Sequence, residues 1–253
     1  MPPRLGGEHR EITALFTDIE GFTGLAESLP APRLGELLND YFEGLATAVM
    51  RHGGLVNDFI GDGMVALFGA PVEQPDHAAR AVRAALDMDT FAAGFAARLR
   101  EEGVAFGRTR IGVHTGAALV GNLGTRSRLK YGAIGDTLNV AARLESLNRF
   151  LGTTVLVSAT TAGAAGGAFR LVGEVALSGR AASTPVLVPH RGGPEAAALH
   201  AGAVEAIRAG EAARAAARLE ALDRLLPGDP VARFHLDRLR DGLCTLEISP
   251  GGK

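Results

Sequence analysis

Two aspartates, Asp18 and Asp62, stand at the ends of apolar, strand-forming runs and could share one divalent cation. Asp18 follows the apolar run from Ile12 to Phe16 and precedes a turn at Gly21 that leads into a helix. A strand-to-helix turn presents backbone N–H groups to phosphate, and a carboxylate beside a phosphate requires a divalent cation between them. Asp62 lies in an Asp-Gly turn between two apolar runs, which predicts a hairpin tip. Taken alone, Asp62 is explained by the preference for Asp-Gly in tight turns, and Asp18 is explained as a residue at the start of a helix. A shared cation site therefore needs further evidence from the sequence.

A third segment carries Asn139 and Arg143, four residues apart among apolar residues at helical spacing. Residues four apart share one face of a helix. An amide and a guanidinium on that face could bind a substrate hydroxyl and a phosphoryl oxygen. The competing interpretation is a polar stripe that faces solvent. Asp136, at the start of the segment, is expected to be the helix N-cap.

The chain contains five segments in a recognisable order: FTDIEGFT, HGGLVNDFIGDGMVALFG, IGVHTG, GNLG and YGAIGDTLNVAARLE. With these segments it resembles the catalytic domain of the class III nucleotidyl cyclases, the adenylate and guanylate cyclases. The resemblance extends from about residue 8 to about residue 189, most of the chain. The expected element order, β-α-α-β-β-α-β-β-α-β, is that of an α+β fold with a ferredoxin-like split βαβ sheet and helices on one face.

The C-terminal part of the chain has a different composition and predicts Ala-rich helices. Ala215, Leu219 and Pro227 stand where a tetratricopeptide unit places a small residue, a large residue and its closing proline. One such unit cannot bury its own apolar face, so it must pack on the catalytic domain, on missing repeats or on a protein partner. The expected parts are a lead-in at 1–10, the catalytic domain at 11–190 and the helical, tetratricopeptide-like segment at 193–245.

The composition is that of an ordinary globular protein: 253 residues, 47% hydrophobic, 21% charged and a net charge of −2. This charge balance indicates neither a nucleic-acid surface nor a membrane surface. The single cysteine, Cys244, excludes an internal disulfide and fits a reducing compartment. No run approaches the roughly 18 apolar residues that span a bilayer. We expect a cytoplasmic chain, and its abrupt entry into a strand at Glu11 would fit a piece of a larger sensor or membrane-attached protein.

The resemblance implies a nucleoside triphosphate substrate and two Mg²⁺ or Mn²⁺ ions per site. Asp18 and Asp62 would bind both ions, and the backbone carbonyl of Ile19 would be a further ligand. The ribose 3′-hydroxyl would attack the α-phosphate and expel pyrophosphate. The residues that would bind the triphosphate are Gly21, Phe22, Thr23, Arg128 and Arg180.

The resemblance also implies that Asn139 orients the ribose and that Arg143 stabilises charge on the α-phosphoryl group. In the family, the two aspartates come from one subunit and the Asn/Arg helix comes from the other. Because this chain carries both sets, we expect a head-to-tail homodimer with two equivalent sites at its interface. A monomer should be inactive.

Base selection is the point at which the chain departs from the family. The adenine-selecting positions, usually a Lys and an Asp or Thr, hold Asp58 and Gly132 here. An ionised carboxylate only accepts hydrogen bonds, which suits the adjacent donors of guanine better than N1 of adenine. We favour ATP, because adenylate cyclases are the commoner soluble bacterial members, and GTP or loose specificity is the alternative. A catalytically silent nucleotide-binding and dimerisation module is the alternative from another class.

Overall fold

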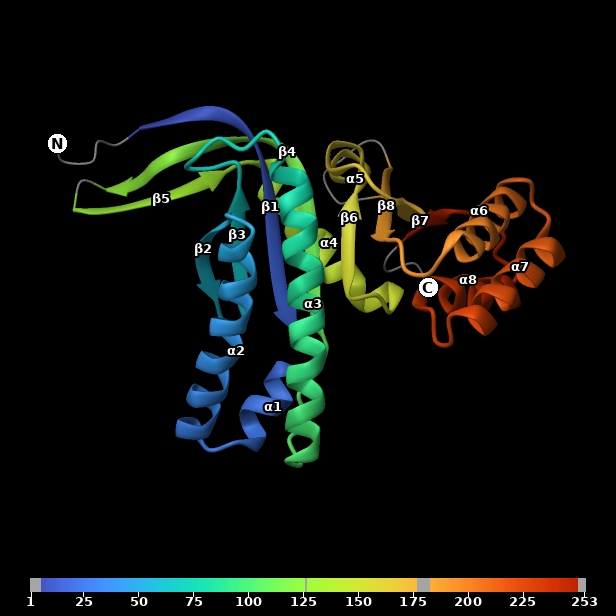
Figure 1. Ribbon diagram of the computed structural model, residues 1–253, viewed down its shortest axis with the longest axis horizontal. Coiled ribbons are helices and arrows are strands. Elements are labelled where there is room, and N and C mark those ends of the chain that lie inside the picture. Colours follow the sequence, from blue (N-terminus) through green and yellow to red (C-terminus); the bar gives the residue numbers. More distant parts are fainter. Residues whose placement is uncertain (1–5, 126, 177–182, 250–253) are drawn as a thin grey trace.

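A computed structural model describes residues 6–125, 127–176 and 183–249, which form one mixed sheet and eight helices (Figure 1). The apolar runs beside Asp18 and Asp62 are strands, and the segment with Asn139 and Arg143 is a helix. The elements in chain order are β1 (Gly6–Ile19), α1 (Phe22–Ser28), α2 (Ala31–Arg51), β2 (Leu55–Ile60), β3 (Gly63–Phe68), α3 (His77–Glu101), β4 (Thr109–Thr125), β5 (Arg128–Ile134), α4 (Asp136–Leu151), β6 (Val155–Ser158), α5 (Ala159–Ala165), β7 (Phe169–Val175), β8 (Thr184–Pro189), α6 (Pro194–Arg208), α7 (Ala212–Leu225), α8 (Pro230–Arg240) and β9 (Glu247–Ile248).

The nine strands of the sheet follow the order β2-β3-β1-β4-β6-β8-β7-β9, with β5 paired to β4 alone. β1 and β4 form the centre of the sheet and are antiparallel, from Gly6 opposite Asn122 to Ile19 opposite Thr109. β4 and β6 are parallel, and the chain passes between them through β5 and α4. This arrangement confirms the α+β fold with a split βαβ sheet that the sequence predicts.

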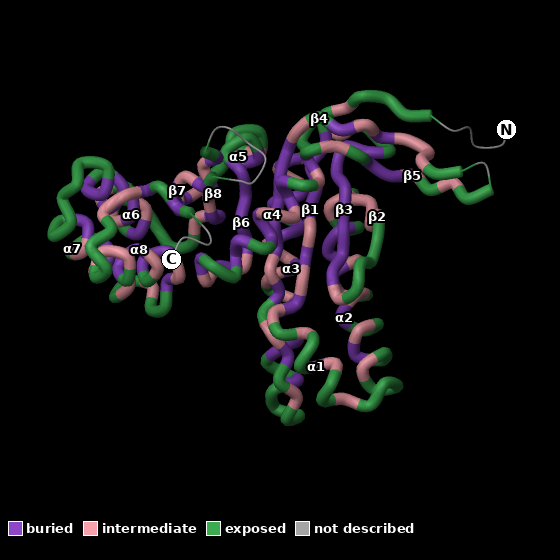
Figure 2. The backbone as a smooth tube through the Cα atoms, turned by 180° about the vertical axis from the view of Figure 1, so that it is seen from behind, coloured by how far each residue is buried: buried purple, intermediate pink, exposed green. Residues whose placement is uncertain are grey.

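Helices cover both faces of the sheet, whereas the sequence analysis expected them on one face. Ile111 and Val113 of β4 belong to the buried cluster that α2 and α3 form with the sheet. Gly112 points the other way, toward α4, and a Cβ here would stand 2.2 Å from the carbonyl oxygen of Ala141. Successive residues of a strand point to opposite faces of the sheet. A strand that is apolar on both faces therefore needs helices packed on both faces. β6 is such a strand, since all 4 of its residues are buried (Figure 2).

β1 begins at Gly6, inside the segment 1–10 that the sequence indicated as a lead-in. Its first residues pair with the second half of β4, from Gly6 opposite Asn122 to Arg10 opposite Ala118. β4 then folds back as β5, and the strands form an arm that extends past the top of β2 and β3 (Figure 1). The glycines and charged residues at the start of the chain do not follow a strand pattern. They form a strand because they pair with β4, which lies far along the sequence.

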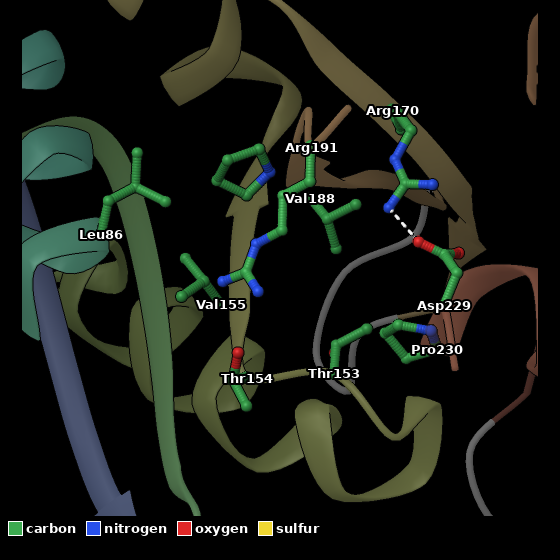
Figure 3. A pocket seen from close by; sticks show the side chains of 10 residues that line it. Leu86, Thr153, Thr154, Val155, Arg170, Val188, Arg191, Asp229 and Pro230 are labelled. Carbon is green, nitrogen blue, oxygen red and sulfur yellow. Dashed lines mark hydrogen bonds and ion pairs between the residues drawn. The ribbon is translucent and has the colours of Figure 1, made fainter. Parts of the chain in front are cut away.

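The helices α6, α7 and α8 pack on one another and dock on β7. Leu219 of α7 lies in one buried cluster with Ala203 of α6 and Ala232 of α8. One docking contact is an ion pair of Arg170 on β7 with Asp229 before α8, 2.6 Å from Nη2 to Oδ2, with side chains only 4% and 5% exposed (Figure 3). Of the three packing surfaces expected for these helices, the structure therefore contains the first, the sheet formed by the preceding part of the chain. In the described ranges, no helix combines the length and apolarity that a membrane crossing requires.

Candidate active site

The end of β1 and the tip of the β2–β3 hairpin bring Asp18 and Asp62 side by side. β1 and β3 are antiparallel neighbours, with Phe16 opposite Val65, so the hairpin tip lies next to the last residues of β1. The backbone N–H of Ile19 donates a hydrogen bond to Oδ2 of Asp62 over 3.1 Å. This bond holds the Asp62 carboxylate at the strand end that carries Asp18.

Close approach of two backbones sets the position of the hairpin. A Cβ on Gly63 would stand 2.3 Å from the carbonyl oxygen of Thr17, so a side chain here would push β3 away from β1. The backbone N–H of Met64 donates a hydrogen bond to the Thr17 hydroxyl over 3.0 Å. Asp62 therefore owes its place to the glycine that follows it in the Asp-Gly turn.

The two carboxylates form a partly buried pair of like charges. Burial raises the pKa of Asp62, and the neighbouring carboxylate of Asp18 raises it further. The Asp18 side chain keeps 31% of its surface exposed, so the pair opens to solvent on one side. A cation between two such groups relieves both their repulsion and their lost hydration.

Arg110 supplies a positive charge that the sequence analysis missed. It lies directly opposite Asp18 in the register of β1 and β4, and it forms an ion pair with the Asp18 carboxylate. Its Nε lies 3.0 Å from Oε1 of Glu145 on α4. Burial raises the pKa of Glu145, with Asp18 adding to the rise and Arg110 opposing it. The signal available in the sequence was the place of Arg110 directly before IGVHTG.

These groups surround an open hollow of about 380 Å³. The turn predicted to bind phosphate forms one wall, where Gly21 has a left-handed φ of 73° and caps α1. The first N–H groups of a helix have no acceptor within the helix and can bind an anion. Arg149, in the last turn of α4, adds a second cation. The residues around the hollow are Asp18, Ile19, Glu20, Gly21, Phe22, Thr23, Asp62, Arg110 and Arg149.

The donor set fits a magnesium or manganese site that the substrate completes. Mg²⁺ is commonly bound by one or two carboxylates together with substrate phosphates and water. Asp18, Asp62 and the backbone carbonyl of Ile19 are hard oxygen donors of this kind. In the part of the chain that the structure describes, no group of three or more His, Cys, Asp or Glu residues could hold a metal ion. Two carboxylates and one carbonyl leave coordination positions of the metal for substrate phosphates and water.

Asn139 and Arg143 lie on α4, and neither borders the hollow. Arg143 and Glu145 are separated by about 200° around the helix, so Arg143 points away from the side that contacts Arg110. Asn139 lies about 15 Å along the helix axis from Arg149, which does border the hollow. Within one chain, the structure thus brings the two aspartates together and keeps the Asn/Arg pair apart from them.

Three further predictions concern the start of α4 and the triphosphate cations. Gly135, not Asp136, is the N-cap of α4, and Asp136 lies in the first turn, where its charge still favours the helix dipole. Arg128 begins β5 on the arm, is exposed and does not border the hollow. Arg180 lies outside the residues that the structure describes.

The two predicted base-selecting positions lie near each other on β2 and β5, although these strands are not paired in the sheet. Oδ2 of Asp58 lies 2.6 Å from Nζ of Lys130 in an ion pair. A Cβ on Gly132 would stand 3.1 Å from Oδ1 of Asn57, the residue before Asp58. These contacts join the arm to β2 at a place separate from the hollow.

A sequence model described as the adenylate and guanylate cyclase catalytic domain matches residues 6–188. The match begins with β1, ends within β8 and includes both aspartates and the Asn/Arg helix. The chain belongs to the adenylate and guanylate cyclase family. The matched part of the chain stops before the C-terminal helices, which dock on it from outside the family domain.

Curated relatives and solved structures support the same family for this chain. Adenylate cyclase 1 of Rhizobium meliloti (strain 1021) is 42% identical over 149 residues, which are 59% of this chain and 22% of that relative. An uncharacterized protein of Mycobacterium tuberculosis (strain CDC 1551 / Oshkosh) is 37% identical over 212 residues, 81% of this chain and 36% of that relative. The chain thus spans only a minor part of the curated relatives it matches.

Two crystal structures are similar to this chain to nearly the same degree. That of the guanylyl cyclase Cya2 has a TM-score of 0.67 and 35% identity, over 75% of this chain and 97% of that one. That of the adenylyl cyclase CyaB from P. aeruginosa has a TM-score of 0.67 and 30% identity, over 74% of this chain and 98% of that one. The fold is therefore shared by cyclases named for either purine.

Proposed function

We propose that this cyclase is an adenylate cyclase, a phosphorus–oxygen lyase that converts ATP to 3′,5′-cyclic AMP and pyrophosphate. The observation that carries the proposal is the pairing of Asp18 with Asp62 beside the Gly21 turn, around a hollow open to a nucleotide. Two carboxylates next to a phosphate-binding turn suit a metal–triphosphate complex. The similarity to Adenylate cyclase 1 supports ATP as the substrate. We assign the activity to residues 11–190 and to the cytoplasm.

In this reaction, the ribose 3′-hydroxyl gives up its proton to solvent and its oxygen bonds to the α-phosphorus. The bond from that phosphorus to the oxygen bridging the β-phosphate breaks, and pyrophosphate leaves. When bound, two Mg²⁺ or Mn²⁺ ions would make the hydroxyl more acidic and neutralise charge on the leaving pyrophosphate. Asp18, Asp62 and the carbonyl of Ile19 would hold these ions. The backbone N–H groups of residues 21–23 would bind oxygens of the β- and γ-phosphates.

We add Arg110 to the groups that bind the triphosphate. Its guanidinium borders the hollow and is already held between the carboxylates of Asp18 and Glu145. A guanidinium can bind a phosphate through two parallel hydrogen bonds, which a lysine cannot do. Arg128 and Arg180, predicted from the resemblance, stay proposals for the same role.

The other half of the site would come from a second copy of the chain. Asn139 would orient the ribose, and Arg143 would stabilise the charge that develops on the α-phosphoryl group. The face of α4 that carries this pair is turned away from the chain's own hollow, which supports a contribution to the site of a partner. A head-to-tail dimer then has two equivalent sites, with Asp58 and Gly132 near the base.

Incubation of the purified protein with each of the four nucleoside triphosphates and Mn²⁺ tests the proposal. We expect 3′,5′-cyclic AMP and pyrophosphate from ATP, identified by chromatography against standards. The similarity to the guanylyl cyclase Cya2 favours cyclic GMP as the second candidate product. Cyclic GMP alone would replace ATP by GTP as the substrate. No cyclic product from any nucleotide, with nucleotide binding retained, would support a silent binding module instead.

A further inference from the structure

We infer that Asn57 reads the base of the nucleotide and that its amide selects adenine. The inference rests on the proposed cyclase activity and adds to it the residue that chooses between ATP and GTP. It starts from the place where β2 and the arm strand β5 meet without pairing in the sheet.

Asn57 is the extra residue of a β-bulge in β2. Its neighbours Val56 and Asp58 stand opposite consecutive residues of β3, which leaves Asn57 without a partner there. A bulge redirects the side chain that it carries, and bulges are common beside active sites. Here the Asn57 side chain turns toward β5, where its Oδ1 would lie 3.1 Å from a Cβ on Gly132.

The Asn57 amide has unused hydrogen-bonding capacity. Its Oδ1 is shielded from solvent and has no hydrogen-bond partner among the residues that the structure describes. A shielded acceptor without a donor is unfavourable unless a ligand or water supplies one. The amide also occupies the space in which a side chain at position 132 would stand. Asn57 thus supplies, from β2, the polar group that Gly132 lacks.

The neighbouring carboxylate is already engaged. Oδ2 of Asp58 pairs with Nζ of Lys130 at 2.6 Å, and Oδ1 accepts a hydrogen bond from the backbone N–H of Phe59 over 3.1 Å. A carboxylate bound at both oxygens is less available to the N1–H and N2–H₂ donors of guanine. The polar group left free at this contact is therefore an amide.

An amide offers one acceptor and one donor side by side. Adenine presents the complementary pair, its N6 amino group next to a ring-nitrogen acceptor, and Asn commonly binds adenine in this way. Guanine presents the reverse order, an acceptor at O6 next to the N1–H donor, so an amide whose oxygen faces the substituent at position 6 favours adenine. The other guanine pair, N1–H and N2–H₂, consists of two donors and matches a carboxylate better. Gly132 lies just before Gly135, the N-cap of α4, so the base contact and Asn139 lie toward the same end of that helix.

The decisive variant is Asn57→Asp, which keeps the size of the side chain and replaces its donor by a second acceptor. Binding of the α,β-methylene analogues of ATP and GTP, which cannot be cyclised, measures base preference without turnover. We expect the preference for the ATP analogue, as a ratio of Kd values, to fall by about tenfold or more. Asn39→Asp, on the exposed side of α2, makes the same change in charge and should leave the ratio as it is.

A double-mutant cycle tests the contact itself. Gly132→Ala puts a methyl group 3.1 Å from Oδ1 of Asn57, so it should weaken binding of the ATP analogue severalfold. In an Asn57→Ala background, the same change should have little effect. Equal effects in both backgrounds would mean that the two residues act independently and would count against the inference.

The outcomes separate this inference from the proposed function. An unchanged preference in Asn57→Asp, in a protein that makes cyclic AMP, would overturn the role of Asn57 and leave the adenylate cyclase intact. Tighter binding of the GTP analogue by the wild type would also overturn it. A protein that forms no cyclic product would refute the proposed activity, and the binding ratios would still decide the role of Asn57.

Discussion

Asp18 and Arg110 face each other across the central strand pair of the sheet and form an ion pair beside the hollow. Arg110 also lies 3.0 Å from Glu145, so one guanidinium stands between carboxylates from two different elements. Because Arg110 and a divalent cation would compete for Asp18, metal binding at this site is coupled to the position of the guanidinium.

Replacing Arg110 by Met should separate metal binding from catalysis. Without the competing positive charge, Asp18 and Asp62 attract Mn²⁺ more strongly, so the Kd for Mn²⁺ without nucleotide should fall severalfold. Loss of a phosphate-binding cation should lower kcat/KM for ATP by about 100-fold. Calorimetric titration with Mn²⁺ and steady-state kinetics measure the two effects.

The control for this variant is Arg214→Met on α7, which removes a charge that is exposed and paired with Glu211. This control should change neither the Kd for Mn²⁺ nor kcat/KM for ATP. Weaker Mn²⁺ binding by Arg110→Met would contradict the competition, because it would mean that Arg110 supports the metal site.

Asp62→Asn should remove activity without destabilising the metal-free protein. The asparagine can still accept the hydrogen bond from Ile19, while the repulsion from Asp18 and the cost of burying a charge, which together raise the pKa of Asp62, disappear. We expect kcat to fall at least about 100-fold. The Tm without metal should equal or exceed that of the wild type, and the gain in Tm on adding Mn²⁺ should be lost. A Tm several degrees lower would show that the Asp62 charge supports the fold.

The aspartates could be predicted from sequence because each stands at the end of an apolar run that also sets its strand. Arg110 could not, because its role depends on the register between β1 and β4, and it lies 92 residues from Asp18 along the chain. A shift of that register by one residue would turn Arg110 to the opposite face of the sheet. The apolar pattern within each strand does not determine which residues pair when the two strands lie so far apart in the sequence.

The layer formed by α4 escaped prediction for a related reason. Its close contact with the sheet depends on Gly112, which lets the backbone of Ala141 approach the strand. Glycine within a strand is usually a weakening residue, and the sequence does not reveal that another backbone lies against it. Which helices form, by contrast, follows from periodicity, and α2, α3 and α4 were all predicted.

Mixing two inactive variants should restore activity if the site is shared between subunits. Asp62→Asn removes the metal half and Arg143→Ala removes the partner half, so a mixed dimer keeps one of its two sites. With random exchange of subunits, half of the dimers are mixed, and about a quarter of the wild-type activity should return. Light scattering of each variant controls for loss of the dimer. Activity no greater than the sum of the separate variants would contradict a shared site.

Two buried histidines should make the fold of the C-terminal helices sensitive to acid. Burial lowers the pKa of His200 on α6 and that of His235 on α8, each to about 4. Histidines of the unfolded chain titrate near pH 6.5, so the unfolded state binds more protons as the pH falls below that value. The free energy of unfolding therefore has its full value above about pH 6.5. It decreases toward pH 4, by up to about 3 kcal/mol for each histidine.

Urea unfolding followed at about pH 7.5 and about pH 5 measures this loss. The charged groups that face the two histidines are Arg170, Asp229 and Arg238. His235→Gln keeps a donor for the carbonyl of Val172, which Nε2 of His235 contacts at 2.7 Å, and should remove part of the pH dependence. An identical pH dependence in this variant would assign the effect to other groups.

Gly63→Ala should displace the hairpin that carries Asp62 without removing any carboxylate from the protein. The new Cβ would lie 2.3 Å from the carbonyl oxygen of Thr17, so β3 must move away from β1. We expect a loss of stability of roughly 1–3 kcal/mol. A shift of about 1 Å between catalytic groups can cost about 100-fold in rate, so kcat/KM should fall at least about tenfold and Mn²⁺ should bind more weakly.

Gly94→Ala is the matched control, because Gly94 is exposed in the middle of α3 and a Cβ added there would have no other atom within 4 Å. It should gain up to about 1 kcal/mol of stability and keep full activity, since alanine is the better helix former. A Gly63→Ala protein that lost stability but kept its Mn²⁺ affinity and kcat/KM would mean that the metal does not depend on the position of Asp62. The close approach of β3 to β1 would then serve the fold alone.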